Sequence, residues 1–335
     1  MKVSVVIPAY NASATIDAAV ESVLAQTVAP DEILVMDDGS TDDTLQHLET
    51  FKPRIRVFRQ SNRGVAHARN LLCQEAKGEV IAFLDADDIW HPKYLEVQCT
   101  RLKNASAMAA VFAGHVNFRS GGAYVWNHAP VVASPDYQLI EPERFVELYN
   151  RCPGPFGSMS FCCIPKRVLA QMGREPFPVI LTGAEDFFLM NVLPFFGPVA
   201  YTALPLVAYR ETPGSLSSNR LETVGVAVRA FELLAGLHES APGGGYVQPF
   251  KRAFASKRRH YAKLLMGSGR AFEARAQLKS SLADPCGLAS LIKSLGLLFC
   301  TYLPVPLHPR WPASHRPSMP SGTGEQMKVT RLNEC

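Results

Sequence analysis

Residues 80–88 read Val80-Ile81-Ala82-Phe83-Leu84-Asp85-Ala86-Asp87-Asp88, an apolar run that ends in a group of carboxylates. A short continuous apolar run bounded by polar residues is typical of a strand that is buried on both faces of a parallel sheet. Ligands of such sheets bind at the carboxyl ends of the strands. The stretch therefore predicts a buried central strand and, directly after it, a binding site.

Two other apolar runs end in the same way. Val3 to Ile7 leads into Pro8-Ala9-Tyr10-Asn11, and Ile33 to Met36 leads into Asp37-Asp38-Gly39-Ser40. Ile55 to Phe58 is a weaker strand, and helical patterns separate the strands. Ser13 is the expected cap of the first helix. This alternation predicts an α/β fold with a mostly parallel central sheet flanked by helices, and it brings three polar clusters to one edge.

The composition limits the classes of function. The chain has 335 residues, of which 47% are apolar and 19% are charged, with a formal net charge of +4. These values exclude a disordered chain and allow one large domain or two ordinary ones. The net charge is too small for the dense basic field of a dedicated nucleic-acid binder, so we expect no nucleic-acid partner.

The cysteines and the N-terminus bear on localisation. Eight cysteines are scattered along the chain without a CxxC pair, which predicts reduced and mostly buried thiols. The apolar run after Met1-Lys2 is too short for a signal peptide. No stretch reaches the roughly 18 apolar residues that a membrane-spanning helix needs. We therefore expect a cytoplasmic protein.

The C-terminal third has a different charge. Beyond a Pro- and Gly-rich linker at 241–245, residues 250–284 predict two helices that break near Gly267-Ser268-Gly269. Between Lys251 and Lys279 there are nine Lys or Arg residues and one acidic residue, Glu273, hence a net charge of +8. One interpretation is docking on an anionic membrane, helped by the apolar run from Leu291 to Leu303. The other is a solvated helix face with a core helix behind it.

Asp85 and Asp87 are the sharpest chemical feature. Mg²⁺ or Mn²⁺ takes one or two protein carboxylates and completes its shell with phosphates and water. The spacing of the two residues suits a metal on one carboxylate while the other accepts a hydrogen bond from a sugar hydroxyl. The alternative is that Asp87 and Asp88 only cap the helix that follows Pro92.

Three further polar sites have a structural alternative of the same kind. Asp38 is placed to accept a hydrogen bond from a nucleobase or a ribose, or it belongs to an ordinary strand-to-helix turn. Tyr10 is placed to stack on a base, or it is a half-buried turn residue. Glu185 and Asp186 open an apolar helix, where they provide a general base or merely interact with the helix dipole.

The combined pattern resembles the family 2 glycosyltransferases, inverting enzymes with the nucleotide-sugar transferase fold called GT-A. The resemblance covers about residues 1–220. It rests on the order and spacing of five segments: residues 3–11, residues 37–44, Asn62-Arg63-Gly64 with Ala68-Arg69-Asn70, residues 85–88, and Gly183-Ala184-Glu185-Asp186.

The resemblance implies roles for the matching donor-side residues. Pro8, Tyr10 and Asp38 would line the nucleoside pocket, with Asp38 on the base, and Arg63 would lie near the same pocket. A UDP-sugar is the expected donor, although GDP- and dTDP-sugars stay open.

The resemblance also implies a ribose contact, a metal ligand and the catalytic base. Asp85 would approach the ribose, Asp87 would hold Mn²⁺ or Mg²⁺ on the diphosphate, and Asp186 would be the catalytic base. Many members carry a histidine between a Tyr-Arg pair and a Pro-Gly-Ser segment. In this chain, Thr212 stands at that position, between Tyr209-Arg210 and Pro213-Gly214-Ser215. The Gln-x-x-Arg-Trp motif of processive synthases is absent from the sequence, which favours transfer of one sugar per encounter.

Other classes fit less well. A nucleotidyltransferase needs a Gly-rich loop after the first strand, and a dinucleotide-dependent dehydrogenase needs GxGxxG there, but this chain has Pro8-Ala9-Tyr10-Asn11. A non-catalytic nucleotide-sugar-binding or scaffold protein on the same fold is the remaining alternative. The presence of all the expected carboxylates argues against it.

These observations predict a transferase of four segments. Residues 1–112 would bind the nucleotide-sugar, and residues 113–235 would carry the acceptor side and the base. Residues 236–307 would form the basic helical extension, and residues 308–335 a disordered tail. The activity that the resemblance implies is inverting, metal-dependent transfer to a glycan or lipid-linked acceptor in bacterial surface polysaccharide or lipopolysaccharide synthesis. The protein would be cytoplasmic or peripheral on the inner face of the plasma membrane.

Overall fold

A computed structural model describes residues 1–103, 107–119, 124, 126, 137–212, 220–240, 247–283 and 287–302. The chain divides between residues 213 and 214 into two compact units. The expected linker at 241–245 and the expected tail at 308–335 lie outside the described residues. The assignment of the segments to donor, acceptor and extension stays a prediction.

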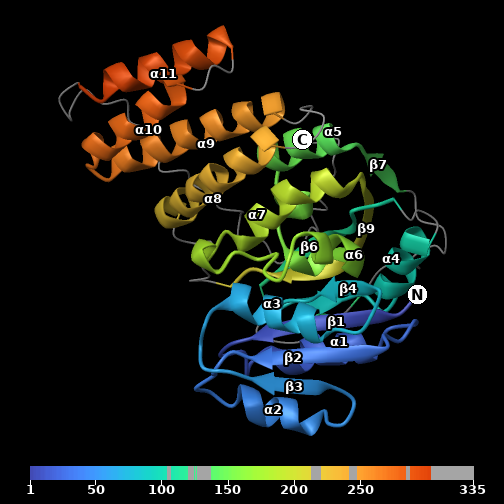
Figure 1. The fold of residues 1–335 in the computed structure, drawn as a ribbon. Helices are drawn as coiled ribbons and strands as arrows, with labels where there is room; N and C mark the ends of the chain where they lie inside the picture. Colours follow the sequence, from blue (N-terminus) through green and yellow to red (C-terminus); the bar gives the residue numbers. More distant parts are fainter. Residues whose placement is uncertain are drawn as a thin grey trace. The chain divides into compact units, whose positions relative to one another are not determined.

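The first unit is built on one mixed sheet. Its strands lie in the order β3-β2-β1-β4-β8-β6-β9-β5, and β7 pairs with β9 (Figure 1). The strands are β1 (Val3–Ala9), β2 (Glu32–Asp37), β3 (Arg56–Arg59), β4 (Val80–Phe83), β5 (Ile89–Trp90), β6 (Ala110–Phe118), β7 (Gln138–Ile140), β8 (Cys162–Pro165) and β9 (Val199–Arg210).

The four strands expected from the apolar runs are confirmed. β1 pairs in parallel with both β2 and β4, and β2 pairs in parallel with β3. Their carboxyl ends therefore lie at one edge of the sheet, as the sequence predicted. β8 then runs antiparallel to β4 and β6, whereas β6 and β9 are parallel.

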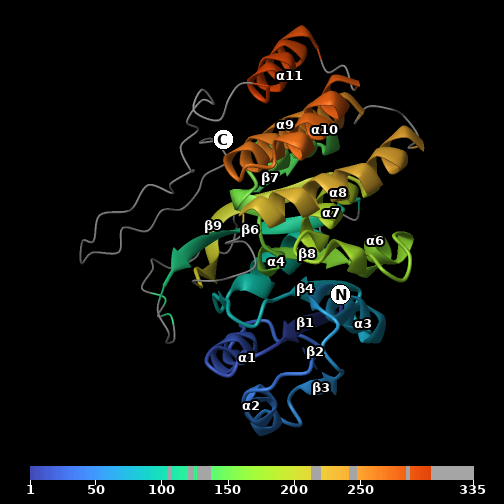
Figure 2. The same ribbon diagram turned by 90° about the vertical axis from the view of Figure 1, so that its left-hand side faces the viewer.

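Helices cover the sheet. α3 packs on β1 and β2, and Figure 2 shows α1 and α2 on the other side of these strands. Ser13 is not the cap of α1, because the helix begins after Thr15 and the Ser13 amide instead donates to Asp42 Oδ2 at 3.1 Å. The helices are α1 (Ile16–Leu24), α2 (Thr44–Thr50), α3 (Val65–Glu75), α4 (Tyr94–Lys103), α5 (Pro142–Arg151), α6 (Lys166–Gln171), α7 (Glu185–Val192), and the short 3₁₀ turns η1 (Gly154–Phe156), η2 (Met159–Phe161), η3 (Val179–Leu181) and η4 (Leu193–Phe196).

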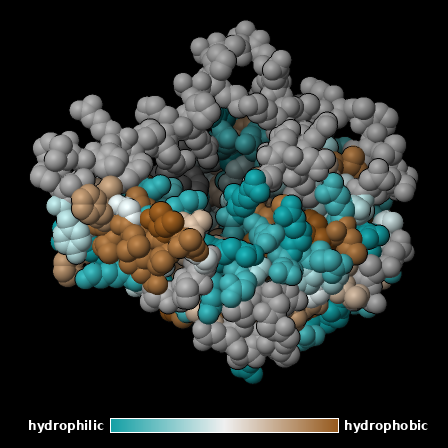
Figure 3. Space-filling view, turned by 90° about the horizontal axis from the view of Figure 1, so that it is seen from above, coloured by the Kyte–Doolittle hydropathy of each residue, from teal (hydrophilic) through white to brown (hydrophobic). Residues whose placement is uncertain are grey.

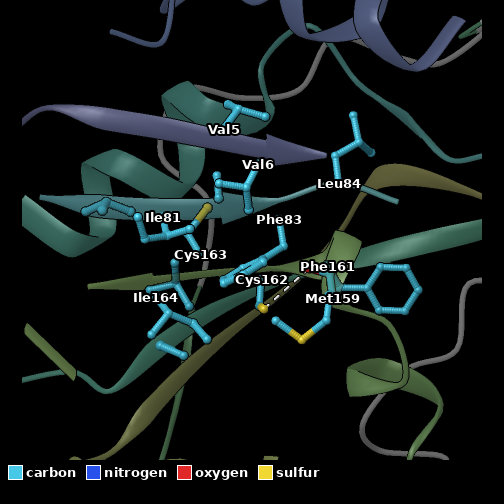
Figure 4. Close-up of a cluster of buried hydrophobic side chains, with 14 of the residues drawn as sticks. Val5, Val6, Ile81, Phe83, Leu84, Met159, Phe161, Cys162, Cys163 and Ile164 are labelled. Carbon is cyan, nitrogen blue, oxygen red and sulfur yellow. Dashed lines mark hydrogen bonds between the residues drawn. The ribbon is translucent and has the colours of Figure 1, made fainter. Parts of the chain in front are cut away.

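The core lies around β1, β4 and β8. Apolar side chains of these strands interdigitate with those of η2, and the Cys162 Sγ lies 3.4 Å from the Met159 carbonyl oxygen (Figure 4). The expectation of reduced thiols holds for the free cysteines, which are Cys73, Cys99, Cys162, Cys163 and Cys300. It is wrong for Cys152, which is disulfide-bonded.

The second unit is helical. α8 (Arg220–Ser240) packs on α9 (Val247–Gly267), and α10 (Ala271–Ala283) and α11 (Leu288–Cys300) pack on α9 and on each other. The predicted break is confirmed, since α9 ends at Gly267 and Gly269 adopts a φ of +78°. None of the helices described here is long and apolar enough to cross a membrane.

Candidate active site

The carboxyl edge of the parallel strands carries a cluster of acidic residues. Asp37 is the last residue of β2, and Asp85 follows β4. The Asp88 amide donates to the Asp85 carbonyl at 3.1 Å, so residues 85–88 form a tight turn before β5. The turn places Asp85, Asp87 and Asp88 at the same strand end, as the sequence predicted.

Asp38 organises the loop at residues 60–64. Its Oδ1 accepts hydrogen bonds from Gln60 Nε2 at 2.6 Å and from the Arg63 amide at 2.9 Å, and its Oδ2 accepts from the Gly64 amide at 2.8 Å. Gly39 beside it has a φ of +76°, and a Cβ there would lie 2.7 Å from the Asn62 amide nitrogen. Asp38 thus holds the conformation of the loop at residues 60–64 by accepting hydrogen bonds from its backbone amides.

The loop after β1 is hydrogen-bonded to the residues that follow Asp38 and Gly39. Asn11 adopts a left-handed φ of +48°, which Asn tolerates better than most residues. The Asn11 amide donates to Ser40 Oγ at 3.0 Å, and Asn11 Oδ1 accepts from the Thr41 amide at 2.9 Å. Pro8 is buried in β1, whereas the Tyr10 side chain is 49% exposed and therefore accessible to a ligand.

Arg69 connects the two sides of the cluster. It lies on the buried face of α3, and its guanidinium donates to Asp85 Oδ1 at 2.7 Å and to Glu185 Oε1 at 2.9 Å. Glu185 Oε2 also accepts from the Gly183 amide at 2.9 Å. Burial lowers the pKa of Arg69, but the carboxylates of Asp85, Glu185 and Asp186 outweigh burial and raise it, so Arg69 stays charged.

Asp186 lies beside this ion-pair network at the start of α7. Its Oδ1 accepts from the Phe187 amide at 2.6 Å. Burial and the Glu185 carboxylate raise the pKa of Asp186 to about 7, against the lowering effect of Arg69. A carboxylate with a pKa near neutrality is suited to accept a proton at physiological pH.

Asp87 and Asp88 meet the end of β9. The Arg210 amide donates to Asp88 Oδ1 at 2.9 Å, and Arg210 Nε donates to the Asp87 carbonyl at 2.8 Å. Burial and Asp85 raise the pKa of Asp87 to about 6. Within the described residues, no other residue donates a hydrogen bond to the Asp87 carboxylate, which is therefore available to a cation. Asp88, in contrast, is fully buried and supports the turn.

The described residues hold no ready group of three metal-ligating side chains. Mg²⁺ and Mn²⁺ can bind through one or two protein carboxylates and take their remaining ligands from a phosphorylated substrate. Asp87, with Asp85 two residues away, provides such a partial ligand set.

The structure thus brings together Asp85, Asp87 and Asp186, and it places Tyr10 and Asp38 at the same sheet edge. The Arg63 side chain is exposed, and only its backbone amide contacts Asp38. Sequence reasoning missed the roles of Arg69 and Arg210. The signal for Arg69 was its place on the apolar face of a predicted helix, where an unpaired charge would be costly.

Aromatic rings pack together near the acidic turn. The His115 ring stacks on Phe161 at 4.3 Å and meets Tyr209 edge-on at 6.1 Å. Burial lowers the pKa of His115 to about 4, so this imidazole is neutral at pH 7. Burial and the nearby Asp88, Asp85, Asp87 and Asp186 raise the pKa of Tyr209. The imidazole of this ring cluster therefore adds no positive charge beside the acidic turn at neutral pH.

A parallel α/β half with acidic strand ends, facing a helix that begins with two carboxylates, is the arrangement of the GT-A fold. Two solved structures share it. Staphylococcus aureus TarS 1–349 in complex with UDP-GlcNAc has a TM-score of 0.64 and 17% identity over 90% of both chains. Mannosyltransferase PcManGT from Pyrobaculum calidifontis, in complex with GDP-Man and Mn²⁺, has a TM-score of 0.54 and 19% identity over 91% of this chain and 82% of its own.

Sequence comparison gives the family. The model of "Glycosyl transferase family 2" matches residues 4–169. The Escherichia coli UDP-Glc:alpha-D-GlcNAc-diphosphoundecaprenol beta-1,3-glucosyltransferase WfgD is 32% identical over 225 residues, which are 66% of this chain and 81% of WfgD. E. coli chondroitin synthase is 37% identical over 128 residues, only 19% of that protein. The chain belongs to glycosyl transferase family 2, and its relatives act in bacterial polysaccharide synthesis.

Proposed function

We propose that the protein transfers one sugar from a nucleotide-diphospho-sugar to an acceptor hydroxyl, with metal assistance and inversion at the anomeric carbon. One observation carries the proposal. Arg69 binds Asp85 on the donor side and Glu185 next to Asp186 on the opposite side, at 2.7 and 2.9 Å. One buried guanidinium therefore holds both the donor-side Asp85 and the residue that precedes the proposed base.

The donor binds at the carboxyl edge of β1, β2 and β4. Tyr10 stacks on the nucleobase, Pro8 forms the pocket floor, and the loop shaped by Asp38 and Arg63 closes its side. Asp85 accepts a hydrogen bond from the ribose. A UDP-sugar is the favoured donor, because the name of WfgD includes UDP-Glc and TarS was solved with UDP-GlcNAc. GDP-sugars are tested as well, because PcManGT was solved with GDP-Man.

Asp87 holds Mn²⁺ or Mg²⁺ on the diphosphate. When bound, this cation would neutralise the negative charge that develops on the leaving diphosphate. The Asp87 carboxylate is partly exposed, and no other described residue donates a hydrogen bond to it. Burial and the negative charge of the neighbouring Asp85 raise the pKa of Asp87, and a bound cation would offset both effects.

Asp186 accepts the proton of the acceptor hydroxyl. Its pKa near 7 keeps a substantial fraction of the carboxylate unprotonated at neutral pH while leaving it basic enough to act. The Phe187 amide donates to its Oδ1, and Arg69 holds the neighbouring Glu185. The hydroxyl attacks the sugar from the face opposite the diphosphate, so one displacement inverts the anomeric centre.

The acceptor is a glycan or a lipid-linked sugar of bacterial surface polysaccharide or lipopolysaccharide synthesis. The diphosphoundecaprenol in the name of WfgD supports the lipid-linked form. Such an acceptor is held in a membrane, so the protein would work in the cytoplasm as a peripheral protein of the inner face of the plasma membrane. In this arrangement residues 1–112 serve the donor and residues 113–235 the acceptor.

Donor turnover tests the proposal. A panel of UDP-, GDP- and dTDP-sugars is incubated with the full chain and Mn²⁺, with and without a diphospholipid-linked sugar acceptor, and release of nucleoside diphosphate is measured. We expect release with one donor, and its loss in Asp186→Asn and on chelation. The matched control is Glu175→Gln, which neutralises an exposed carboxylate outside the cluster. Turnover that survives Asp186→Asn refutes the base, and nucleotide-sugar binding without any turnover indicates the scaffold alternative.

A further inference from the structure

α11 carries an exposed apolar stripe. Its large side chains point outward at spacings of four, three, four and three residues, which keeps them on one face of a helix. Ile292 is 60% exposed and Phe299 is 68% exposed. In the view from above, side chains of this helix form a brown, hydrophobic patch next to hydrophilic surface (Figure 3). The stripe consists of Leu288, Ile292, Leu295 and Phe299 of α11 and of Tyr302 just beyond its C-terminal end.

Polar contacts fix this orientation of α11. Ser294 is fully buried on the other face, and its Oγ lies 2.9 Å from Ser281 Oγ. Arg259 of α9 donates to Ser290 Oγ at 2.7 Å and to Ser294 Oγ at 3.3 Å. An ordinary surface helix turns only its core-facing side apolar, but α11 packs Leu297 and Leu298 against the helical core and also carries the apolar stripe on its outer face. A contiguous apolar stripe held outward in this way marks an interaction surface.

The surroundings of the stripe are positively charged. The described residues from 247 to 302 include ten Lys or Arg residues and one acidic residue, Glu273, which pairs with Arg270. Lys293 is exposed next to Ile292 in the stripe. At the other end of α11, the Arg275 guanidinium lies 4.3 Å over the Tyr302 ring. An apolar face with a basic border complements a surface that is apolar inside and anionic outside.

We infer that the α11 stripe is a docking surface for an anionic lipid membrane. A helix of 13 residues is about 20 Å long, shorter than the roughly 30 Å hydrocarbon core, so α11 lies in the interface rather than across it. Ile292 and Phe299 enter the acyl boundary while Lys293 and Arg275 contact anionic headgroups. A second copy of the chain is the weaker candidate, because it would bring an equal positive charge against the same face.

Vesicle flotation tests this inference with the full chain and without donor or acceptor. The inference deepens the proposed function by placing the enzyme where a lipid-linked acceptor is found, yet binding is measured independently of transfer. We expect binding to phosphatidylcholine vesicles that contain phosphatidylglycerol and little binding to pure phosphatidylcholine. Raising the salt from about 0.1 M to about 1 M shortens the Debye length from about 10 Å to about 3 Å and should weaken binding.

The apolar contribution is tested with Ile292→Ser/Phe299→Ser. Both side chains are exposed, so the variant should fold, which its thermal unfolding checks. Burial of two large apolar side chains is lost, so we expect vesicle affinity to fall at least about tenfold. The matched control is Leu139→Ser/Leu233→Ser, two exposed apolar residues outside the stripe, which should bind like the wild type.

The inference fails on any of three results. The first is that the folded Ile292→Ser/Phe299→Ser variant binds anionic vesicles as well as the wild type does. The second is that the wild type binds neutral and anionic vesicles equally, or binds neither. The third is that sedimentation velocity without vesicles shows an oligomer that Ile292→Ser/Phe299→Ser converts to a monomer, which would assign the stripe to a second copy of the chain.

Discussion

Arg69 of α3 donates to Glu185 of α7 at 2.9 Å, although 116 residues separate them in the sequence. Both side chains are buried, and the same guanidinium holds Asp85. The ion pair therefore sets the separation between the donor side of the cluster and the helix that begins with Glu185 and Asp186. Its strength comes from a charge-assisted hydrogen bond on each side of the guanidinium.

We predict that Arg69→Ala lowers both stability and turnover. Two buried or half-buried carboxylates lose their common partner, which costs on the order of 3–5 kcal/mol for a buried pair, and misplacement of Asp186 lowers kcat by about 10²-fold. Urea unfolding and steady-state kinetics measure the two effects. Arg56→Ala is the control, because it breaks the surface ion pairs of Arg56 with Glu32 and Glu75 and should cost under about 1 kcal/mol per pair. An unchanged kcat in a folded Arg69→Ala would show that Arg69 does not position the base.

We predict that kcat/KM rises with pH through about 7. The Asp186 carboxylate, with its pKa raised to about 7, accepts no proton while it is protonated, so activity is low below this pH and levels off above it. A pH profile with the preferred donor gives the apparent pKa. A profile that is flat between pH 5 and 8 would contradict the assignment of Asp186.

The same pKa predicts the effect of Asp186→Asn on stability. The folded state keeps the Asp186 proton to about pH 7, whereas the unfolded chain releases it near 3.8, so this group destabilises the fold as pH rises between these values. Asp186→Asn removes the charge. It should raise the unfolding temperature at pH 8 by a few degrees, on the order of 2–4 °C per kcal/mol, and the difference should shrink at pH 5. A difference that grows as pH falls would contradict this prediction.

We predict that Asp87→Asn weakens Mn²⁺ binding in the presence of nucleoside diphosphate. The amide keeps the size of the side chain but lacks the charge that a hard cation needs. Titration calorimetry with Mn²⁺ and UDP should show at least about a tenfold loss of affinity, as for disturbed metal sites. Asp43→Asn, an exposed acid before α2, is the control. Equal Mn²⁺ affinity in Asp87→Asn and the wild type would remove Asp87 from the metal site.

Gly39→Ala and Gly64→Ala separate a steric clash from backbone strain. Both glycines have positive φ angles, +76° and +86°, which cost a non-Gly residue about 1–2 kcal/mol. Only at Gly39 would the new Cβ meet backbone, 2.7 Å from the Asn62 amide nitrogen. We expect Gly39→Ala to raise the donor KM more than Gly64→Ala does, because it displaces the loop that Asp38 organises. Equal KM values in the two variants would show that this loop does not contact the donor.

The donor side was predictable because its signals are local. Each apolar run is short, each ends in polar residues, and parallel strands align their ends, so Asp38, Asp85 and Asp87 follow from neighbouring sequence. β5 was not predicted, because its two residues carry no periodic pattern and it forms only by pairing with β9. Arg210 was missed for the same reason, since its partners precede it by more than 120 residues.

The face of α11 could not be read from the sequence either. The apolar run from Leu291 to Leu303 indicated a helix that is buried or interfacial, without saying which side faces outward. That choice depends on Arg259 and Ser281, which lie on other helices. Helix boundaries in this unit, in contrast, follow from the glycines at 267 and 269, whose effect is local.

The position of β9 has a consequence for synthesis of the chain. β1 to β4 are adjacent in the sheet and nearly consecutive in sequence, so they can pair as soon as residue 83 leaves the ribosome. The turn at Asp87 and Asp88 gains its Arg210 contacts only at the end of β9. The nascent protein can therefore form the strands of the proposed donor side first and complete the contacts of the acidic turn more than 120 residues later. A chain truncated before Arg210 would keep these strands but lack the two hydrogen bonds from Arg210 to Asp87 and Asp88.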